Sequence, residues 1–215
     1  LAMDRAVMTD DNPEIHLEDL PAERIDGVRA SVTVMFGCNN FCTYCVVPYT
    51  RGREVSRPLK KIVDEVRALA GQGYREVQLL GQNVNSYRDG EYDFSDLLRE
   101  INKIEGIERI RFITSHPRDL TERLIKTMAE LEKVCEHLHL PIQSGSDRIL
   151  RLMNRGYTYE EYKKKVELLR THIPDIAITT DIITGFPSET EEDHRLTIRA
   201  LEEIQYDGIF AFKYL

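Results

Sequence analysis

The chain has 215 residues and a formal net charge of -8, with 41% hydrophobic and 31% charged residues. This length suits one domain with a sizeable core. The acidic balance argues against a protein that binds nucleic acid over its whole surface, although it leaves room for a local basic patch. The sequence shows neither an apolar run long enough to span a bilayer nor a secretion signal, so we expect a cytoplasmic protein with no membrane partner.

Residues 1–30 are polar, acidic and only weakly periodic, which predicts a linker or an edge segment from a preceding domain. Short apolar runs bounded by Gly, Pro or polar residues follow, as in buried parallel strands. They predict six strands, at 31–36, 75–81, 109–114, 137–142, 176–183 and 208–215. Because the last run reaches Leu215, we expect a core domain over residues 31–215 that is truncated within its sixth strand.

Helical patterns lie between these runs and predict helices at 58–71, 94–104, 121–134, 159–170 and 189–204. Alternating strands and helices are typical of an α/β fold with a parallel sheet and right-handed crossovers. Such a repeat can form an open doubly wound sheet or a barrel. Six units favour a partial (β/α)6 TIM-like barrel over a closed barrel of eight. In either arrangement, functional residues belong at the C-terminal ends of the strands.

Cys38, Cys42 and Cys45 form a CxxxCxxC motif in the loop after the first predicted strand. In a cytoplasmic chain such clustering indicates metal or redox chemistry before disulfides. Three thiolates can hold three irons of a 4Fe-4S cluster, which leaves the fourth iron open to chelate a substrate. The remaining cysteine, Cys135, precedes a predicted buried strand, where we expect an unreactive core residue.

Other interpretations of this motif stay open on the residues alone. A structural zinc site would need a fourth Cys or His in a compact unit, and the sequence has none nearby. An electron-transfer cluster could use Cys135 as its fourth ligand. The spacing could also be a coincidence. The alternative class of function is therefore an electron-transfer or structural metal-binding protein.

Two longer stretches carry a family resemblance: GCNNFCTYCVVPYTRGREVSR (37–57) and LLGQNVNSY (79–87). The cysteine motif, with Tyr44 before its last cysteine, resembles the radical S-adenosylmethionine (SAM) superfamily. Together the two stretches are similar to the tRNA methylthiotransferases, specifically the 2-methylthio-isopentenyladenosine synthase (MiaB) type. The resemblance runs from about Pro21 to the end of the chain. Relatives that methylthiolate a ribosomal protein usually depart from GQNVNSY, and they are the alternative within the superfamily.

The resemblance implies a radical SAM core with a 4Fe-4S cluster on three cysteines, an open fourth iron, and SAM as second cofactor. In the family, the reduced cluster cleaves SAM to methionine and a 5′-deoxyadenosyl radical, which removes hydrogen from an unactivated carbon. Sulfur then enters at carbon 2 of a prenylated adenosine beside the tRNA anticodon, and a second SAM gives the methyl group. The implied partners are the tRNA anticodon loop and an electron donor such as flavodoxin or ferredoxin.

Family members also carry an N-terminal domain with a second cluster and a small RNA-binding domain. By resemblance we expect both to be missing from this chain, which has one cysteine to spare beyond the motif.

The resemblance also implies residues that bind SAM, by position and motif context. They are Tyr44, Gly81, Gln82, Asn83, Ser115, Gln143, Arg155 and Asp181. The plain alternatives are a strand-to-helix turn for 81–83, a solvated helix end for Arg155 and a cap or turn for Asp181. Ser115 departs from the acidic residue that some members carry nearby, and we expect its neighbour His116 to be a hydrogen-bonded structural residue.

Three arginines, Arg51, Arg53 and Arg57, follow the cysteine motif and could contact phosphates of an RNA loop. Tyr49 in the same segment could stack on a base. The alternatives are ion pairing with Glu54 for the arginines and simple packing for the tyrosine.

Overall fold

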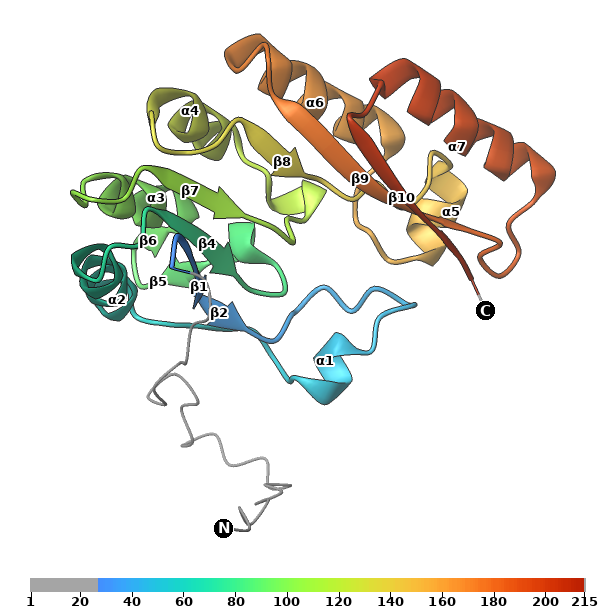
Figure 1. The fold of residues 1–215 in the computed structure, drawn as a ribbon. Helices are drawn as coiled ribbons and strands as arrows, with labels where there is room; N and C mark the ends of the chain where they lie inside the picture. The colour runs from blue at the N-terminus through green and yellow to red at the C-terminus, as the bar shows by residue number, and fades with distance from the viewer. Residues whose placement is uncertain (1–26, 215) are drawn as a thin grey trace.

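The computed structural model describes residues 27–214, in which six parallel strands form the centre of the fold (Figure 1). They are β1 (Arg29–Thr33), β4 (Glu76–Leu80), β7 (Arg109–Phe112), β8 (His137–His139), β9 (Ala177–Thr184) and β10 (Gly208–Lys213). β1, β4 and β7 pair in that order in one sheet, and β8, β9 and β10 pair in that order in a second. All four pairings are parallel, as the alternating pattern predicts.

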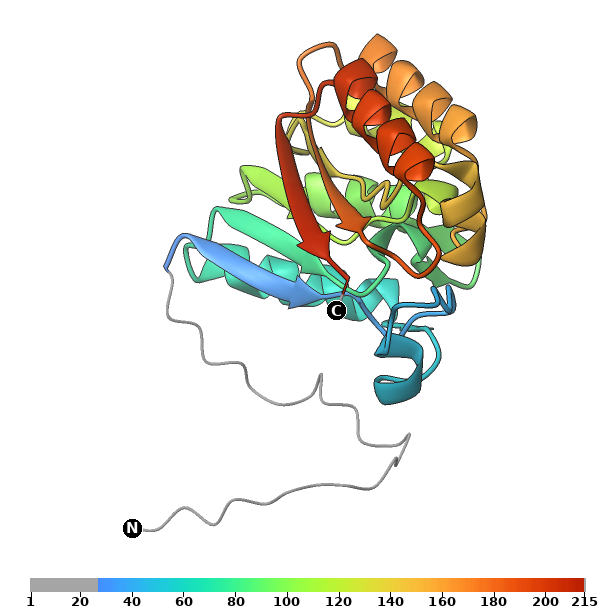
Figure 2. The same cartoon turned by 90° about the vertical axis from the view of Figure 1, so that its right-hand side faces the viewer.

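A single parallel bridge between Ile110 and Val134 joins the two sheets. The Ile110 N–H donates to the Lys133 carbonyl (2.7 Å), and the Cys135 N–H donates to the Ile110 carbonyl (3.0 Å). The six strands therefore follow one another around an arc in chain order. β1 and β10 are its two edges in the described part of the chain (Figure 2). The predicted partial (β/α)6 barrel is confirmed.

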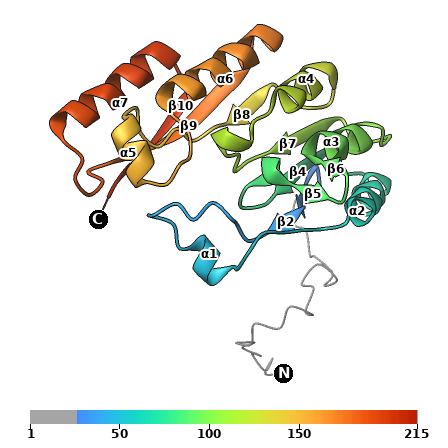
Figure 3. The ribbon, with the colours of Figure 1, turned by 180° about the vertical axis from the view of Figure 1, so that it is seen from behind.

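The helices lie along the outside of this arc (Figures 1 and 3). They are α2 (Leu59–Gly71), α3 (Phe94–Asn102), α4 (Glu122–Glu130), α6 (Tyr159–His172) and α7 (Glu191–Ile204). Each turns an apolar stripe toward the strands, for example Ile62, Val66 and Leu69 of α2, which are buried in the main core. Burying these stripes against the outer face of the strands positions the connecting loops at the C-terminal end of the barrel.

β7 ends at Phe112 and β10 at Lys213, each two residues before its predicted end, and two other predicted strands differ more from the structure. The run 31–36 divides into β1 and a short β2 (Met35–Phe36), which pairs antiparallel with β3 (Val55–Ser56). β8 ends at His139 rather than at 142. Pro141 has no N–H to donate, and the Ile142 N–H donates to the Thr180 hydroxyl (2.9 Å) instead of to a strand carbonyl.

Several short elements lie between the predicted ones and escaped prediction. They are α1 (Val47–Thr50), the 3-10 turn η2 (Val84–Ser86), β5 (Arg88–Asp89), β6 (Tyr92–Asp93), the 3-10 turn η3 (Pro117–Asp119) and α5 (Asp147–Leu152). None has more than six residues, which is too short for an apolar period to appear.

The predicted linker or edge segment over residues 1–30 lies outside the described residues except for its last four. Two of these four, Arg29 and Ala30, belong to β1, so the first strand begins before the predicted domain start at 31. Residue 215, the predicted end of the sixth strand, is also outside the described part.

A buried carboxylate joins the start of α5 to α7. Asp193 accepts hydrogen bonds from the hydroxyls of Ser146 and Thr190 (2.6 Å each) and pairs with Arg148. The same contact region leaves no room for a side chain at Gly145, because a Cβ there would lie 2.4 Å from the Leu196 carbonyl oxygen. The segment that follows β8 is thereby packed against α7. The hydrogen bond from Arg148 makes the largest contribution to lowering the pKa of Asp193, and those from Ser146 and Thr190 lower it further.

We predict that Asp193→Asn lowers the free energy of unfolding by about 1–3 kcal/mol, because the substitution keeps the shape but loses charged hydrogen bonds. The folded-state pKa of Asp193 lies below the value of an unfolded aspartate, so this stabilisation is present above about pH 4 and is lost as the pH falls further. Urea denaturation between pH 3 and pH 7 measures both effects. The exposed Asp175→Asn is the control and is expected to match the wild type. Equal stability of Asp193→Asn and the wild type at pH 7 would contradict the prediction.

Candidate functional site

The cysteine loop, residues 37–53, begins with a sharp turn at the C-terminal end of β2. Gly37 has a φ of +66°, and a Cβ at this position would overlap the carbonyl oxygen of Arg53. The Cys38 N–H donates to the Gly52 carbonyl (3.3 Å), which closes the loop. Within it Cys38 and Cys42 are buried and Cys45 is half-buried. A glycine is therefore required where the chain folds back on itself to bring the thiols under cover.

Side chains and carbonyls from the end of α5 fasten the cysteine loop to the far side of the barrel. The Asn154 amide donates to the carbonyls of Asn40 (3.2 Å) and Phe41 (3.0 Å). The Thr43 N–H donates to the Met153 carbonyl (3.2 Å). These bonds join segments more than a hundred residues apart in the chain and fix the backbone on both sides of Cys42.

Arg155 lies directly behind the cysteine loop. Its Nη1 donates to Cys42 Sγ (3.4 Å) and to the Tyr44 hydroxyl (3.2 Å). Its Nε donates to the Tyr157 hydroxyl (2.9 Å), and Nη2 donates to the Pro141 carbonyl (2.9 Å). The side chain is buried, so the alternative of a solvated helix end is wrong. A permanent cation sits beside a thiol of the motif.

The other two thiols of the motif lie close enough to Cys38 to affect its ionisation. Burial raises the pKa of Cys38, and the nearby Cys42 and Cys45 raise it further. Within residues 27–214, no three His, Cys, Asp or Glu side chains converge on a single metal ion. A cubane cluster makes no such demand, since each thiolate binds its own iron. Three adjacent thiols with N–H donors at two sulfurs, Asn40 N to Cys38 and Arg155 to Cys42, fit such a cluster.

Four buried polar atoms at the ends of β4 and β7 have no hydrogen-bond partner among the described residues. They are Gln82 Oε1, Asn83 Oδ1, Ser115 Oγ and His116 Nε2. Leaving such an atom unpaired costs roughly 1–3 kcal/mol, so a group of four at one end of the barrel indicates a polar ligand. A ligand with amino, carboxylate or hydroxyl groups would supply the matching donors and acceptors.

His116 is neutral, because its pKa is lowered to about 2. Burial is the main cause, and the positive charges of Arg155 and Arg118 add to it. Its Nδ1 accepts from the Arg118 N–H (3.1 Å), so the proton of the neutral ring is on Nε2. The expected hydrogen-bonded structural histidine is therefore confirmed at Nδ1. At Nε2 the ring presents a buried donor that the protein leaves unused within the described residues.

Gly81 directly follows β4 and lies in close contact with Met35 of β2. A Cβ at Gly81 would lie 2.4 Å from Met35 Cγ, and the Gly81 carbonyl accepts a hydrogen bond from the Thr114 hydroxyl (2.6 Å). The absence of a side chain at Gly81 therefore lets Met35 pack closely against the backbone. That Gly81 also lies near the SAM amino group remains a prediction.

Gln143 and Asp181 lie together across the barrel from β4. The Gln143 N–H donates to the Asp181 carbonyl (2.9 Å), and its carbonyl accepts from Ile183 (3.0 Å). Gln143 has a φ of +72°, a left-handed conformation that is costly for a residue with a side chain. The Asp181 carboxylate lies 3.4 Å from His139 Nε2, within β9, and the alternative of a cap or turn is wrong.

The outer segment of the cysteine loop exposes cationic and aromatic side chains. Tyr49 is 77% exposed, and Arg51 and Arg53 are also exposed. The Phe41 ring supports two of them, with the Arg53 guanidinium 4.6 Å from its centre and the Tyr49 ring edge-on at 5.9 Å. This surface can meet an anionic, aromatic partner.

Arg57 does not belong to this surface. It is buried, and its Nη1 lies 2.9 Å from the Glu65 carboxylate and donates to the Thr33 carbonyl. The predicted contact between Arg57 and RNA phosphates is wrong, because the guanidinium is committed to the interior. Its ion pair is with Glu65 and not with Glu54, the partner that the sequence suggested.

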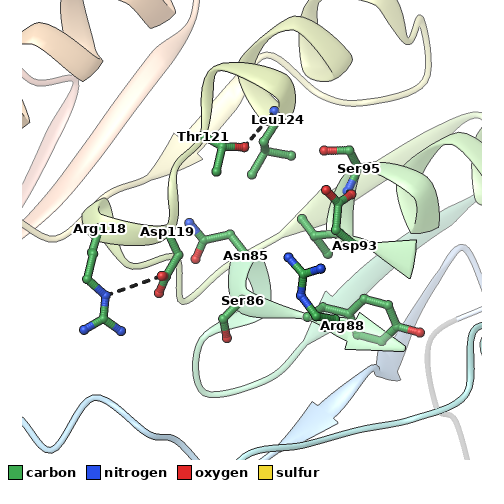
Figure 4. A pocket seen from close by; sticks show the side chains of 11 residues that line it. Asn85, Ser86, Arg88, Asp93, Ser95, Arg118, Asp119, Thr121 and Leu124 are labelled. Atoms are coloured by element: carbon green, nitrogen blue, oxygen red, sulfur yellow. Dashed lines mark hydrogen bonds and ion pairs between the residues drawn. The ribbon is translucent and has the colours of Figure 1, made fainter. Parts of the chain in front are cut away.

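A cavity of about 290 Å³ borders the site on the side of η2 and η3 (Figure 4). Arg118 and Asp119 form one wall, and Asp93, Ser95 and Arg88 face them. Arg118 also reaches Asn40 Oδ1 in the cysteine loop, and Asp119 accepts from the Asn83 amide (2.7 Å). The cavity wall therefore takes part in positioning both the cysteine loop and Asn83.

Sequence reasoning missed the residues that connect the loops, chiefly Asn40, Asn85 and Asn154. Asn85 donates to the His116 carbonyl (2.9 Å) and accepts from the His116 N–H (2.8 Å), which binds the loop after β4 to the loop after β7. Asn85 lies in the GQNVNSY stretch and Asn154 precedes Arg155, so both stand in or beside segments that the sequence analysis singled out. Their role is to bind backbone groups that are distant in the chain, and no local sequence pattern indicates such a contact.

The described residues contain no helix of the length and hydropathy required to cross a bilayer. Comparison with solved structures supports the fold. The radical SAM methyltransferase TsrM from Kitasatospora setae superposes with a TM-score of 0.71 at 23% identity, over 86% of this chain and 36% of that one. Coproporphyrinogen III oxidase (HemN) from Escherichia coli gives 0.63 at 17% identity, over 87% and 44%.

Curated relatives are much more similar in sequence. The tRNA-2-methylthio-N(6)-dimethylallyladenosine synthase of Thermodesulfovibrio yellowstonii is 61% identical over 97% of this chain and 48% of its own length. The enzyme of the same name from Acetivibrio thermocellus is 60% identical, over 92% and 42%. The chain thus spans about half the length of the curated relatives it matches. The sequence model of the radical SAM superfamily matches residues 32–201, which is most of the chain. With its cysteine loop at the C-terminal end of a parallel partial barrel, this chain belongs to the radical SAM superfamily.

Proposed function

We propose that this chain is the SAM-cleaving core of a tRNA methylthiotransferase that acts on carbon 2 of a prenylated adenosine beside the anticodon. The observation that carries the proposal is the 61% identity, over 97% of the chain, to a relative named for making 2-methylthio-N(6)-dimethylallyladenosine in tRNA. The site supports it, because three adjacent thiols lie at the same end of the barrel as a group of buried polar atoms that the protein does not pair among its described residues.

Membership of the radical SAM superfamily implies a 4Fe-4S cluster and SAM. We assign one iron to each of Cys38, Cys42 and Cys45, with the fourth iron open to SAM. When bound, this pair supplies the one-electron chemistry that removes hydrogen from a carbon that acid–base catalysis cannot activate. The chain's own contribution is to hold the thiols in a covered loop, with Arg155 donating to one sulfur.

The SAM contacts are assigned by the chemistry of the unpaired groups. The oxygens of Gln82 and Asn83 can accept from the amino group or the ribose, and Ser115 and the His116 Nε2–H can donate to oxygens of the ligand. This is the arrangement expected where a zwitterion binds between two strand ends.

The other predicted contacts are assigned by the chemistry of their side chains. Asp181 and Gln143 suit ribose hydroxyls, Arg155 suits the carboxylate, and Tyr44, hydrogen-bonded to Arg155, and Gly81 complete the surroundings.

The tRNA anticodon loop would meet the exposed segment of the cysteine loop. Arg51 and Arg53 suit phosphates, and Tyr49 suits an unstacked base. Electrons would come from a donor such as flavodoxin or ferredoxin. The alternative of an electron-transfer cluster with Cys135 as fourth ligand conflicts with the fold. Cys135 precedes β8, at the N-terminal end of the parallel strands, whereas the cysteine loop lies at their C-terminal end.

We predict that Cys42→Ala abolishes both bound iron–sulfur cluster and 5′-deoxyadenosine formation, because one iron loses its ligand. Cys135→Ala is the matched control, a thiol-to-methyl change at the opposite end of the barrel, and should retain both. Iron and sulfide analysis after anaerobic reconstitution, followed by chromatography of SAM cleavage products, measures the two effects. A large loss of cluster from Cys135→Ala would overturn the three-cysteine assignment.

We further predict that these 215 residues cleave SAM but do not complete methylthiolation. The resemblance implies a second cluster as sulfur source, and beyond the motif the chain has only Cys135, which cannot supply three ligands. Reduced, reconstituted protein is incubated with SAM and prenylated tRNA, and 5′-deoxyadenosine and methylthio-nucleoside are quantified separately, with Cys42→Ala as blank. Absence of 5′-deoxyadenosine would contradict the proposed SAM-cleaving role. Catalytic formation of the methylthio-nucleoside would show that no second cluster is needed.

A further inference from the structure

The last strand, β10, carries three aromatic side chains at alternate positions. Phe210 is 55% exposed, Phe212 is 54% exposed and Tyr214, directly after the strand, is 37% exposed. We call these three residues the β10 aromatic face. Alternate residues of a strand point to the same side, so the three rings form one surface.

The pairing register shows which side this is. Phe210 is paired with Asp181 of β9, and Phe212 with Ile183. On β9 the intervening Ile182 is buried in the core between strands and helices. Residues paired directly in a parallel sheet share a face, so the β10 aromatic face lies on the side away from the helices, inside the barrel. Figure 2 shows β10 as one edge of the open side of the barrel.

At Phe210, nearest the start of β10, this face lies beside the residues predicted to bind the SAM ribose. The Phe210 ring lies edge-on to His139, with 6.1 Å between ring centres. His139 Nε2 in turn lies 3.4 Å from the Asp181 carboxylate. An apolar ring that is more than half exposed thus stands next to a carboxylate assigned to the cofactor.

At Tyr214, after the C-terminal end of β10, the face approaches the cysteine loop. The Tyr214 ring lies edge-on to Phe186 at 5.3 Å, and Phe186 forms a small apolar cluster with Ile149 and Met153. Tyr44, the aromatic residue of the cysteine motif, packs against the same cluster, as does Ile183. The β10 aromatic face is therefore continuous with the site and is not an isolated surface patch.

The opposite part of the inner wall has a different character. Glu76 on β4 forms ion pairs with Arg109 (2.8 Å) and Arg111 (3.2 Å) on β7. The inner wall is thus charged near the start of β4 and β7 and aromatic along β10. A ligand group that packs on β10 must be flat or apolar, which excludes the phosphates and the amino acid end of SAM as its occupant.

We propose that the β10 aromatic face binds the prenylated adenine of the RNA substrate, with its rings against the base and the branched dimethylallyl chain. This inference rests on the proposed function. An adenine taken out of its stack exposes π faces that aromatic side chains bind, and the five-carbon prenyl chain adds apolar surface that water solvates poorly. Phe210 and Phe212 would then decide whether prenylated RNA is preferred over unprenylated RNA.

The test measures binding of two anticodon stem-loop RNAs, identical except for N6-dimethylallyladenosine or adenosine at the target position. Reconstituted chain with SAM is titrated into each labelled RNA, and fluorescence anisotropy yields both Kd values. We expect the wild type to prefer the prenylated RNA by about tenfold or more, in keeping with burial of several methyl and methylene groups. The Phe210→Ala/Phe212→Ala variant should lose this preference and bind both RNAs as the wild type binds the unprenylated one.

Ile209→Ala is the matched control, since Ile209 is 44% exposed on the same strand but faces the helix side. It should keep the wild-type preference. The single variants Phe210→Ala and Phe212→Ala, each expected to lose part of the preference, replace the double variant should its iron content or thermal unfolding differ from the wild type.

Three outcomes would overturn the inference. The double variant could keep the full preference, or the wild type could show none. The double variant could also lose SAM affinity while its RNA binding is unchanged, which would assign the face to the adenine of SAM. The proposed function is scored separately by 5′-deoxyadenosine formation in the wild type, so its failure is distinguishable from each of these results.

Discussion

The site depends on hydrogen bonds that reach the cysteine loop from distant parts of the chain. Apart from α1, the loop has no regular structure to pair its own backbone groups, and a polar backbone under cover must find partners elsewhere. Asn154 supplies donors to two of its carbonyls, and Arg118 binds the side chain of Asn40. With these bonds in place, two buried thiols keep fixed positions on an otherwise irregular segment.

The parallel barrel makes these long-range bonds possible. Strands that all run in one direction place every strand-to-helix loop at the same end, so the loops after β1, β4, β7 and β8 meet there. Asn85 binds the second of these loops to the third, and Asn83 binds to Asp119 across the same gap. The same end also contains the four polar atoms without protein partners in the described structure. Such atoms lower stability, and a fold retains them where a ligand pairs them.

Sequence reasoning identified the long elements because their periodicity is strong. α2 and α7 begin and end within two residues of their predicted bounds, and β4 and β9 within one. The errors have physical causes. A proline ended β8 early, since Pro141 cannot donate to a neighbouring strand. Arg57 was assigned to the surface on its proximity to the cysteine motif, whereas Glu65 and a strand carbonyl hold it inside.

The sequence by itself determined the alternation of strands and helices, the thiol-bearing loop, and the polar residues at the strand ends. All of these are local patterns of spacing and residue type, which a sequence displays directly. The tertiary structure alone decided which of these residues meet. It placed Arg155 against Cys42, more than a hundred residues away, and turned Phe210 and Phe212 toward the inside of the barrel beside Asp181. Contacts of this kind follow from the register and direction of strands, and no local pattern encodes them because they arise only when the helices bury their apolar stripes and the sheet curves around them.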